Sequence, residues 1–219
     1  MFITFEGVDG SGKSTQIRMA IDYLRQCGQN VLPVHEPGGT SIGDQVRTIL
    51  LDNMDNTEMH ARTEVLLFCA SRAQLVEESI SPHLESGGVV VCDRYIDSTY
   101  VYQGYGHGQN LDSLRKIVGF ATNGLIPDLT IFLDIDPETA LRRRSEGTLF
   151  GEDWNRLDDM NLEFHKRTYK GYQELMLREP ARFVKVNASN PPDKVHADIR
   201  KVLAEWLKLP QNNEQKEDK

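Results

Sequence analysis

The segment at residues 2–16 constrains the fold more than any other part of the sequence. A short apolar run leads into the pattern G-x-x-x-x-G-K-S, whose two glycines are Gly7 and Gly12. Such glycines let the backbone curl until successive N–H groups point at one anion. Residues 16–25 follow with apolar side chains at helical spacing, so a helix N-terminus would face the same anion. The pattern predicts a strand, a phosphate-binding loop and a helix, in a chain that binds a nucleoside triphosphate.

The two polar residues that follow the second glycine of this loop are expected to have different roles. Lys13 is predicted to reach the β- and γ-phosphates, and the Ser14 hydroxyl is predicted to ligate Mg²⁺. The predicted phosphate-binding residues are Gly7, Val8, Asp9, Gly10, Ser11, Gly12, Lys13, Ser14 and Thr15.

Composition narrows the class of protein. With 219 residues, 39% of them hydrophobic, the chain can bury the core of one α/β domain. Its formal net charge of −8 disfavours a broad nucleic-acid-binding surface, because such a surface needs a basic face to displace counterions. Three widely spaced cysteines without a C-x-x-C pair are typical of a reducing compartment. The chain enters its first strand directly and has no long apolar run, so we expect no membrane partner and a cytoplasmic location.

Alternating apolar runs and amphipathic segments predict the rest of the fold. Continuous Val/Ile/Leu/Phe-rich runs, typical of a parallel sheet covered on both faces, occur at 2–6, 31–35, 89–93, 129–135 and 183–187. Helices are expected near 13–26, 41–51, 60–85, 111–122, 137–146, 158–179 and 192–208. We therefore predict one domain over residues 1–209, in which helices cover a central five-stranded parallel sheet in three layers, and a disordered tail at 210–219. Ligands of such sheets bind beyond the carboxyl ends of the strands.

Polar and charged residues directly follow the second and third predicted strands. Glu36 and Pro37 begin a Pro-Gly-Gly loop, and Arg47 lies on the next helix, facing either the cleft or solvent. Asp93 and Arg94 end the third strand. A carboxylate at this position can hold Mg²⁺ or its water ligands, and a guanidinium beside it matches the geometry of phosphate oxygens. This part of the sequence predicts a site for an acceptor phosphate and a metal ion.

A second group of residues suits a nucleobase. Phe68 and Arg72 are four residues apart and share a helix face, where a ring could stack on a base and a guanidinium could donate to its exocyclic oxygen. Taken alone, Phe68 fits core packing better than base stacking. The polar and aromatic stretch at 97–105 adds three candidate contacts, which are Thr99, Tyr102 and Gln103.

The densest cationic cluster of this acidic chain spans about residues 142–157. It contains Arg142, Arg143, Arg144 and Arg156 and is interrupted by glycines. Such a segment could act as a lid that excludes water and brings an arginine to a transferring phosphoryl group. The phosphate-binding loop has no arginine at its variable positions, so this task is open to the lid.

Together these motifs resemble the thymidylate kinase family of P-loop nucleoside-monophosphate kinases. The residues that carry the resemblance are FEGVDGSGKSTQ at 5–16, EPGGT at 36–40, FCASRAQ at 68–74, the Asp-Arg-Tyr and Tyr-Gln-Gly segments within 93–104, PDLTIFLD at 127–134 and NRLD at 155–158. The resemblance runs from residue 2 to about 207. It implies phosphorylation of dTMP to dTDP with ATP and Mg²⁺, which supplies dTTP for DNA synthesis, by a homodimer packed through helices.

The resemblance also implies roles for the acceptor residues. Asp9 is expected to contact the acceptor sugar and organise the phosphate and metal site, while Arg47 and Arg94 grip the acceptor phosphate. Tyr102 is expected beneath the sugar, where it disfavours a 2′-hydroxyl. For the base, Phe68 would stack on thymine, Arg72 would donate to its O4, and Thr99 and Gln103 would lie near its edge.

On the donor side, the resemblance places Arg143 near adenine, flanked by residues 187–191. Arg156 is expected to stabilise the transferred charge from the lid. Gly10 stands where some family members carry an arginine, so the chain resembles the members whose lid supplies it.

Two other kinases remain open on the sequence alone. A kinase for another nucleotide or small molecule would keep the loop and the lid, and the Phe68, Arg72 and Tyr102 set argues against it. A deoxynucleoside kinase would need a general base, for which Glu36 is suitably placed. A GTPase switch would show an Asn-Lys-x-Asp motif, and the sequence has none.

Overall fold

The five predicted strands form a single sheet in the order β2-β3-β1-β4-β5, and every neighbouring pair is parallel. The computed structural model describes residues 1–51, 58–148 and 160–209. The strands are β1 (Phe2–Glu6), β2 (Val31–His35), β3 (Val89–Asp93), β4 (Leu129–Asp134) and β5 (Phe183–Asn187). The register of β1 and β3 sets Phe5 opposite Asp93, which brings the carboxyl ends of the central strands to one edge of the sheet.

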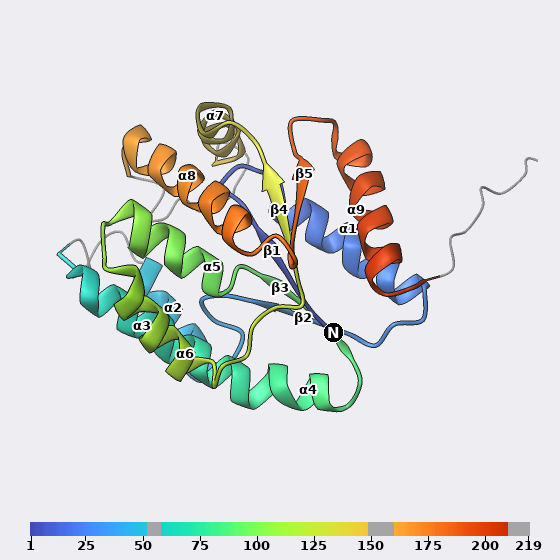
Figure 1. Cartoon of the computed structure of the whole chain (residues 1–219), viewed down its shortest axis with the longest axis horizontal. Coiled ribbons are helices and arrows are strands. Elements are labelled where there is room, and N and C mark those ends of the chain that lie inside the picture. Colours follow the sequence, from blue (N-terminus) through green and yellow to red (C-terminus); the bar gives the residue numbers. More distant parts are fainter. Residues whose placement is uncertain (52–57, 149–159, 210–219) are drawn as a thin grey trace, which may run out of the picture.

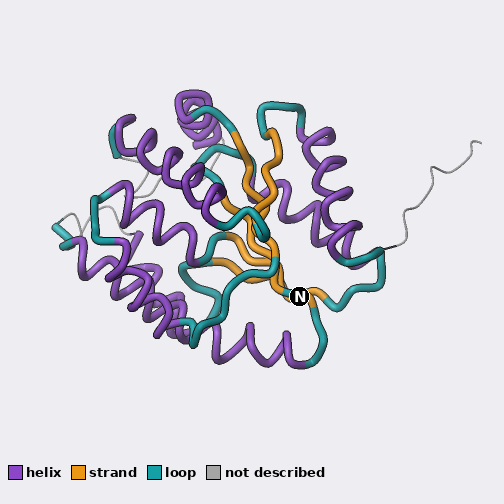
Figure 2. Tube along the Cα trace, viewed as in Figure 1, coloured by secondary structure: helices purple, strands orange, loops and turns teal. Residues whose placement is uncertain are grey.

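Helices cover both faces of the sheet, as Figure 1 shows. On one face lie α1 (Lys13–Gln26) and α9 (Pro192–Trp206), which pack against each other. The other face is covered by α3 (Ala61–Leu75), α6 (Leu111–Ala121) and α8 (Leu162–Arg178), and α2 (Ser41–Leu51) packs on α3. The remaining α-helices are α4 (Ser81–Glu85), α5 (Ile96–Thr99) and α7 (Pro137–Thr148). In Figure 2 the strands form the centre of the molecule, between these helical layers.

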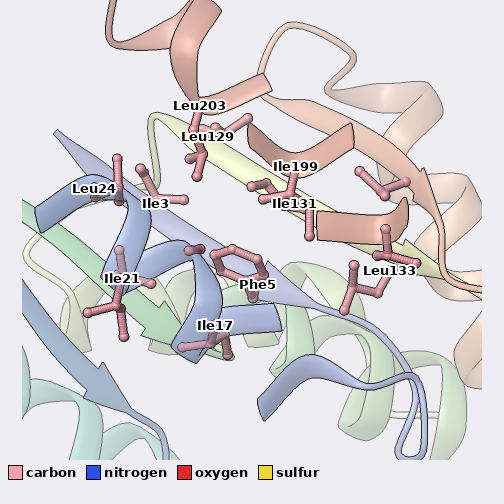
Figure 3. Packing of buried hydrophobic residues seen from close by; sticks show 14 of the residues in the cluster. Ile3, Phe5, Ile17, Ile21, Leu24, Leu129, Ile131, Leu133, Ile199 and Leu203 are labelled. Atoms are coloured by element: carbon pink, nitrogen blue, oxygen red, sulfur yellow. The ribbon is translucent and has the colours of Figure 1, made fainter. Parts of the chain in front are cut away.

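The central strands β1, β3 and β4 are buried on both faces and largely apolar, whereas the edge strands β2 and β5 are partly exposed. Ile3 and Phe5 point to the side of α1 and α9, as Figure 3 shows, whereas Phe2 belongs to the cluster under α3 and α6. All five residues of β1 are buried, including the charged Glu6. Burial of this continuous apolar surface provides the main driving force for the fold.

The predicted five-stranded parallel sheet is confirmed, and two helical predictions need correction. The helix expected at 60–85 is divided into α3, a π-helical segment η1 (Val76–Ile80) and α4. The stretch 96–106 is helical, formed by α5 and the π-helical segment η2 (Tyr100–Gly106), although the sequence did not indicate a helix there. Its glycines and aromatic residues are poor helix formers, and packing of η2 against α8 overrides that preference. The fourth strand ends at Asp134, one residue earlier than predicted.

Two further observations concern the described residues as a whole. Cys27, Cys69 and Cys92 are free thiols, and the last two are buried. None of the described helices combines the length and the apolar character needed to cross a membrane.

Candidate active site

A cavity of about 1390 Å³ lies at the carboxyl edge of the sheet. Its volume exceeds the roughly 300–1,000 Å³ typical of a site for one small ligand, so it has room for two. The described residues predicted for the site line this one cavity, apart from Gly7, Val8 and Asn187. The phosphate-binding loop, the end of β3 and α7 contribute Asp9, Gly10, Ser11, Gly12, Lys13, Ser14, Thr15, Asp93 and Arg143. The segments after β2 and β3, with α2, α3, α5 and η2, contribute Glu36, Pro37, Arg47, Phe68, Arg72, Arg94, Thr99, Tyr102 and Gln103.

The phosphate-binding loop connects β1 to α1. Gly10 and Gly12 have φ angles of +82° and +88°, a region that side chains disfavour, which explains the need for glycine at these turns. The Lys13 ammonium donates to the carbonyls of Gly7 at 3.1 Å and Val8 at 3.3 Å, so these two residues fold the lysine over the loop. Burial, with nearby Arg94, lowers the pKa of Lys13. A polyanion bound in the loop would offset the free-energy cost of burying the charged ammonium.

Arg94 begins the turn after β3 and forms the centre of a charged cluster. Its guanidinium donates to Asp9 Oδ1 at 2.5 Å, and the Tyr102 hydroxyl donates to the other oxygen of Asp9 at 2.9 Å. The guanidinium carbon also lies 5.0 Å from the centre of the Tyr102 ring. Although burial opposes the effect, Arg94 and Lys13 lower the pKa of Asp9 below its ordinary value. Three predicted residues from three separate elements are therefore already joined.

Arg72 and Glu36 form a second buried pair. The Arg72 Nε and Nη2 atoms donate to the Glu36 carboxylate at 2.6 to 3.0 Å, and the two side chains are only 1% and 3% exposed. Although burial opposes it, Glu36 raises the pKa of Arg72. The remaining nitrogen, Arg72 Nη1, is buried and has no hydrogen-bond partner among the described residues. It is a donor that a polar ligand in this cavity could satisfy.

The neighbours of this pair complete the same side of the cavity. Phe68, one helical turn before Arg72 on α3, is half-buried and lines the cavity. Gln103 donates to the buried Glu64 at 2.8 Å. Arg47 is half-buried and lines the cavity, and its Nη1 donates to the Pro37 carbonyl at 2.8 Å.

A divalent cation fits the point where the two sides meet. Asp93 Oδ1 is buried without a hydrogen-bond partner among the described residues, and the exposed Ser14 hydroxyl lines the same cavity. The described part of the chain holds no cluster of three or more His, Cys, Asp or Glu side chains suited to a metal. Mg²⁺ needs no such cluster, since it keeps several waters and is held through one or two carboxylates and the phosphates of its substrate.

A loop at 188–192, after β5, borders the cavity beside α7 and α1. Arg143 on α7 donates to the carbonyls of Ala188 at 2.9 Å and Ser189 at 3.5 Å. From α1, the Gln16 amide donates to the Pro192 carbonyl at 2.9 Å. Arg143 therefore lies beside the loop predicted to flank the donor base.

The phosphate-binding loop also touches α7 closely. A Cβ atom added at Gly10 would lie 2.0 Å from the Ala140 carbonyl oxygen and 3.1 Å from the Arg144 nitrogen. No side chain can occupy position 10 while α7 keeps this place, so an arginine there is excluded in this arrangement.

Two predictions lie outside the described residues. One is Arg156, with the part of the predicted lid at 149–157; residues 142–148 belong to α7. The other is the tail at 210–219.

Sequence reasoning missed a buried network behind Arg94. Glu6, Ser98 and Tyr172 are hydrogen-bonded to one another, and both hydroxyls lie within 3.5 Å of Arg94 Nη1. One signal was available, namely a glutamate that ends an otherwise apolar strand. No pattern linked it to Tyr172, which is 166 residues away.

Comparisons with known proteins agree on one family. The family model "Thymidylate kinase" matches residues 5–199. A protein of Roseiflexus castenholzii named thymidylate kinase is 47% identical over 216 residues, covering 94% of each chain. A thymidylate kinase of Thermoanaerobacter sp. is 44% identical over 94% of this chain and 98% of its own. The crystal structure of thymidylate kinase from Ehrlichia chaffeensis superposes with a TM-score of 0.74 at 31% identity, covering 93% and 98% of the two chains.

Proposed function

The chain belongs to the thymidylate kinase family and phosphorylates dTMP to dTDP, and we propose that it does so with ATP and Mg²⁺, with the two nucleotides in opposite sides of the cavity. We assign the acceptor to one part of the cavity because Arg94, Arg72 and Phe68 line the same cavity as the phosphate-binding loop. We call the part lined by 10–15, Arg143 and 188–192 the donor half, and the part lined by Asp9, Glu36, Arg47, Phe68, Arg72 and 94–103 the acceptor half.

In the acceptor half, Arg94 and Arg47 hold the phosphate of dTMP. Arg94 is supported in this role by its pairing with Asp9, which fixes one edge of the planar guanidinium. Asp9 and Tyr102 lie beside the sugar, and their mutual hydrogen bond fixes the ring that excludes a 2′-hydroxyl.

The thymine base lies between Phe68 and the edge formed by Thr99 and Gln103. Arg72 donates to thymine O4 through Nη1, the nitrogen that Glu36 leaves without a partner. A base that presents a donor at this position would face a buried guanidinium with nothing to accept its proton, so the same contact disfavours cytosine.

The reaction needs no general base. The second pKa of a phosphate monoester is about 6, so the attacking oxygen is already anionic at neutral pH. The task of the protein is to bring two polyanions into line and neutralise their charge. Glu36 is a poor candidate for the base of a deoxynucleoside kinase, because its carboxylate accepts the bidentate donation of Arg72.

In the donor half, the loop N–H groups and Lys13 hold the ATP phosphates, while Arg143 and residues 188–192 border adenine. Ser14 and Asp93 would hold Mg²⁺, which when bound neutralises phosphate charge. Arg156 supplies the transition-state contact from a lid at about 142–157. We further propose that residues 1–209 form one catalytic domain and that the enzyme is a cytoplasmic homodimer that supplies dTTP synthesis.

The test is the release of ADP from ATP and Mg²⁺ with dTMP, dUMP, CMP, AMP and thymidine as acceptors. We expect turnover mainly with dTMP, and its loss when Mg²⁺ is chelated. Phosphorylation of thymidine but not of dTMP would overturn the assignment and make Glu36 the base. Equal turnover of CMP and dTMP would contradict the proposed contact between Arg72 and the base.

A further inference from the structure

Glu6 is a buried carboxylate that lies next to the acceptor half without entering it. It is the last residue of β1 and is 0% exposed, and it is not among the residues that line the cavity. A buried charge is costly unless it is paired and fully hydrogen-bonded. What Glu6 binds therefore shows what it stabilises.

One carboxylate oxygen of Glu6 holds the backbone that follows Arg94. Its Oε1 accepts from the backbone nitrogens of Tyr95 at 2.9 Å and Ser98 at 3.2 Å. Arg94 itself has a φ of +67°, a left-handed conformation that is uncommon for a residue with a side chain. The two hydrogen bonds help to hold the chain in the turn that this conformation produces.

The other oxygen reaches the Arg94 side chain through two hydroxyls. Glu6 Oε2 accepts from Ser98 Oγ and from the Tyr172 hydroxyl, each at 2.7 Å. Arg94 Nη1 lies 3.1 Å from the first hydroxyl and 3.5 Å from the second. Because an ionised carboxylate has no proton to give, both hydroxyls donate to Glu6 and turn their lone pairs toward the guanidinium.

We propose that Glu6 is a positioning residue that, through Ser98 and Tyr172, directs the Arg94 guanidinium to the acceptor phosphate without touching the substrate. The inference rests on the proposed function of Arg94. Asp9 fixes the Nη2 edge of the guanidinium, and the Glu6 network fixes its Nη1 edge, so the group is orientated from both sides before dTMP enters. Orientation of this kind lowers the cost of ordering a long side chain on binding.

The burial of Glu6 also determines the pH range in which its carboxyl group is ionised. Burial, with a contribution from Asp97, raises the pKa of Glu6 to about 7 against the opposing effect of Arg94. The ionised form, which accepts from both hydroxyls, therefore predominates only above about pH 7.

The test compares binding of dTMP with binding of thymidine, which differ only in the phosphate. Calorimetric titrations at pH 8.5, where Glu6 is ionised, use Glu6→Gln, Tyr172→Phe, Arg94→Ala and the wild-type chain. Glu6→Gln keeps the shape of the side chain but can place an N–H donor against the Ser98 and Tyr172 hydroxyls, which donate to Glu6 in the wild type. Tyr172→Phe removes one of these hydroxyls at a residue that does not line the cavity. The matched control is Thr4→Val, because Thr4 lies on the same strand, is 0% exposed and loses a 2.9 Å hydrogen bond to Thr130 that does not involve Arg94.

We expect Glu6→Gln to weaken dTMP binding about tenfold, since a charge-assisted network is lost, and to leave thymidine affinity within about twofold. Tyr172→Phe should also weaken dTMP binding, by a smaller factor, and Thr4→Val should leave both affinities unchanged. The proposal is overturned if Glu6→Gln has the same ratio of dTMP affinity to thymidine affinity as the wild type. Such a ratio also results when the variant loses affinity for both ligands equally. If Glu6→Gln yields no folded protein, the ratio in Tyr172→Phe decides.

The failure of the proposed function would look different. If Arg94→Ala itself leaves the ratio unchanged, Arg94 does not bind the phosphate, and its assignment fails together with the inference. If Arg94→Ala lowers the ratio and neither Glu6→Gln nor Tyr172→Phe does, only the inference fails.

Discussion

The two halves of the cavity are built in different ways. The donor half uses contiguous backbone at 7–15, one lysine and a loop held by Arg143 and Gln16. The acceptor half uses side chains from separate elements, joined in ion pairs before any ligand is present. Backbone N–H groups are fixed by the fold, whereas long cationic side chains need partners to hold one orientation. In the proposed acceptor half, the orientation of Arg94 and Arg72 therefore depends on the carboxylates of Asp9 and Glu36.

Arg94→Ala gives the largest effect expected from this difference. The substitution removes the phosphate contact and leaves Asp9 with one partner fewer, so kcat/KM for dTMP should fall about 10³-fold. Arg94→Lys should recover little, because an ammonium cannot make the same planar, two-edged set of contacts. Steady-state kinetics measure both.

The control for Arg94 is Arg115→Ala on α6. Arg115 pairs with Asp112 at 3.1 Å, and the two side chains are 42% and 81% exposed, so the pair contributes little. Its kcat/KM should stay within about twofold of the wild type. Similar losses in the two variants would remove the distinction between buried and exposed pairs.

Arg72→Leu tests whether the buried pairs also support the fold. It leaves the buried Glu36 carboxylate without its ion-pair partner, so the free energy of unfolding should fall by about 3–5 kcal/mol. Lys13→Met, in the donor half, should cost less than about 1 kcal/mol, because burial disfavours the Lys13 charge. Denaturant unfolding compares the two, and an equal cost would contradict the difference between the halves.

Glu6→Gln sharpens the comparison through pH. The ordinary pKa of 4.5 is raised to about 7 in the fold, so Glu6 ionises more readily in the unfolded chain. The unfolding free energy of the wild type therefore falls as the pH rises from about 4.5 to 7. Above that range, the full free-energy cost of ionising Glu6 in the fold is present. Glutamine cannot ionise, so the variant should gain up to about 3 kcal/mol relative to the wild type between pH 5 and 8. A stability difference that does not change with pH would show that Glu6 titrates normally.

Gly10→Ala carries the smallest expected effect and concerns the donor half alone. The new Cβ would collide with the Ala140 carbonyl, so α7 must shift, at a cost of about 1–3 kcal/mol in unfolding free energy. Because Arg143 moves with α7, the affinity for ATP should fall a few-fold while that for dTMP stays constant. Gly28→Ala is the matched control, since Gly28 has a similar φ of +78° and no atom within 4 Å of the added Cβ. Equal costs for both would mean that the contact with α7 has no effect.

The same difference explains how much the sequence could reveal. The donor loop is a contiguous motif between an apolar strand and an amphipathic helix, so its place and its conformation could both be predicted. The proposed acceptor residues could be predicted as candidates after strand ends and on one helix face, but their ion pairs could not be derived. Arg94 and Asp9 are 85 residues apart, and Arg72 and Glu36 are 36 apart. The helical form of 96–106 was missed for a related reason, because contacts with α8 and not local propensity stabilise it.

The most direct test of the proposed site is a crystal structure with dTMP and a non-hydrolysable ATP analogue. We expect the dTMP phosphate to lie against Arg94 and thymine O4 to lie within hydrogen-bond distance of Arg72 Nη1, with the pairs Arg94–Asp9 and Arg72–Glu36 unbroken. Thymine placed beside residues 188–192, or either pair broken by the bound substrate, would contradict the proposed site.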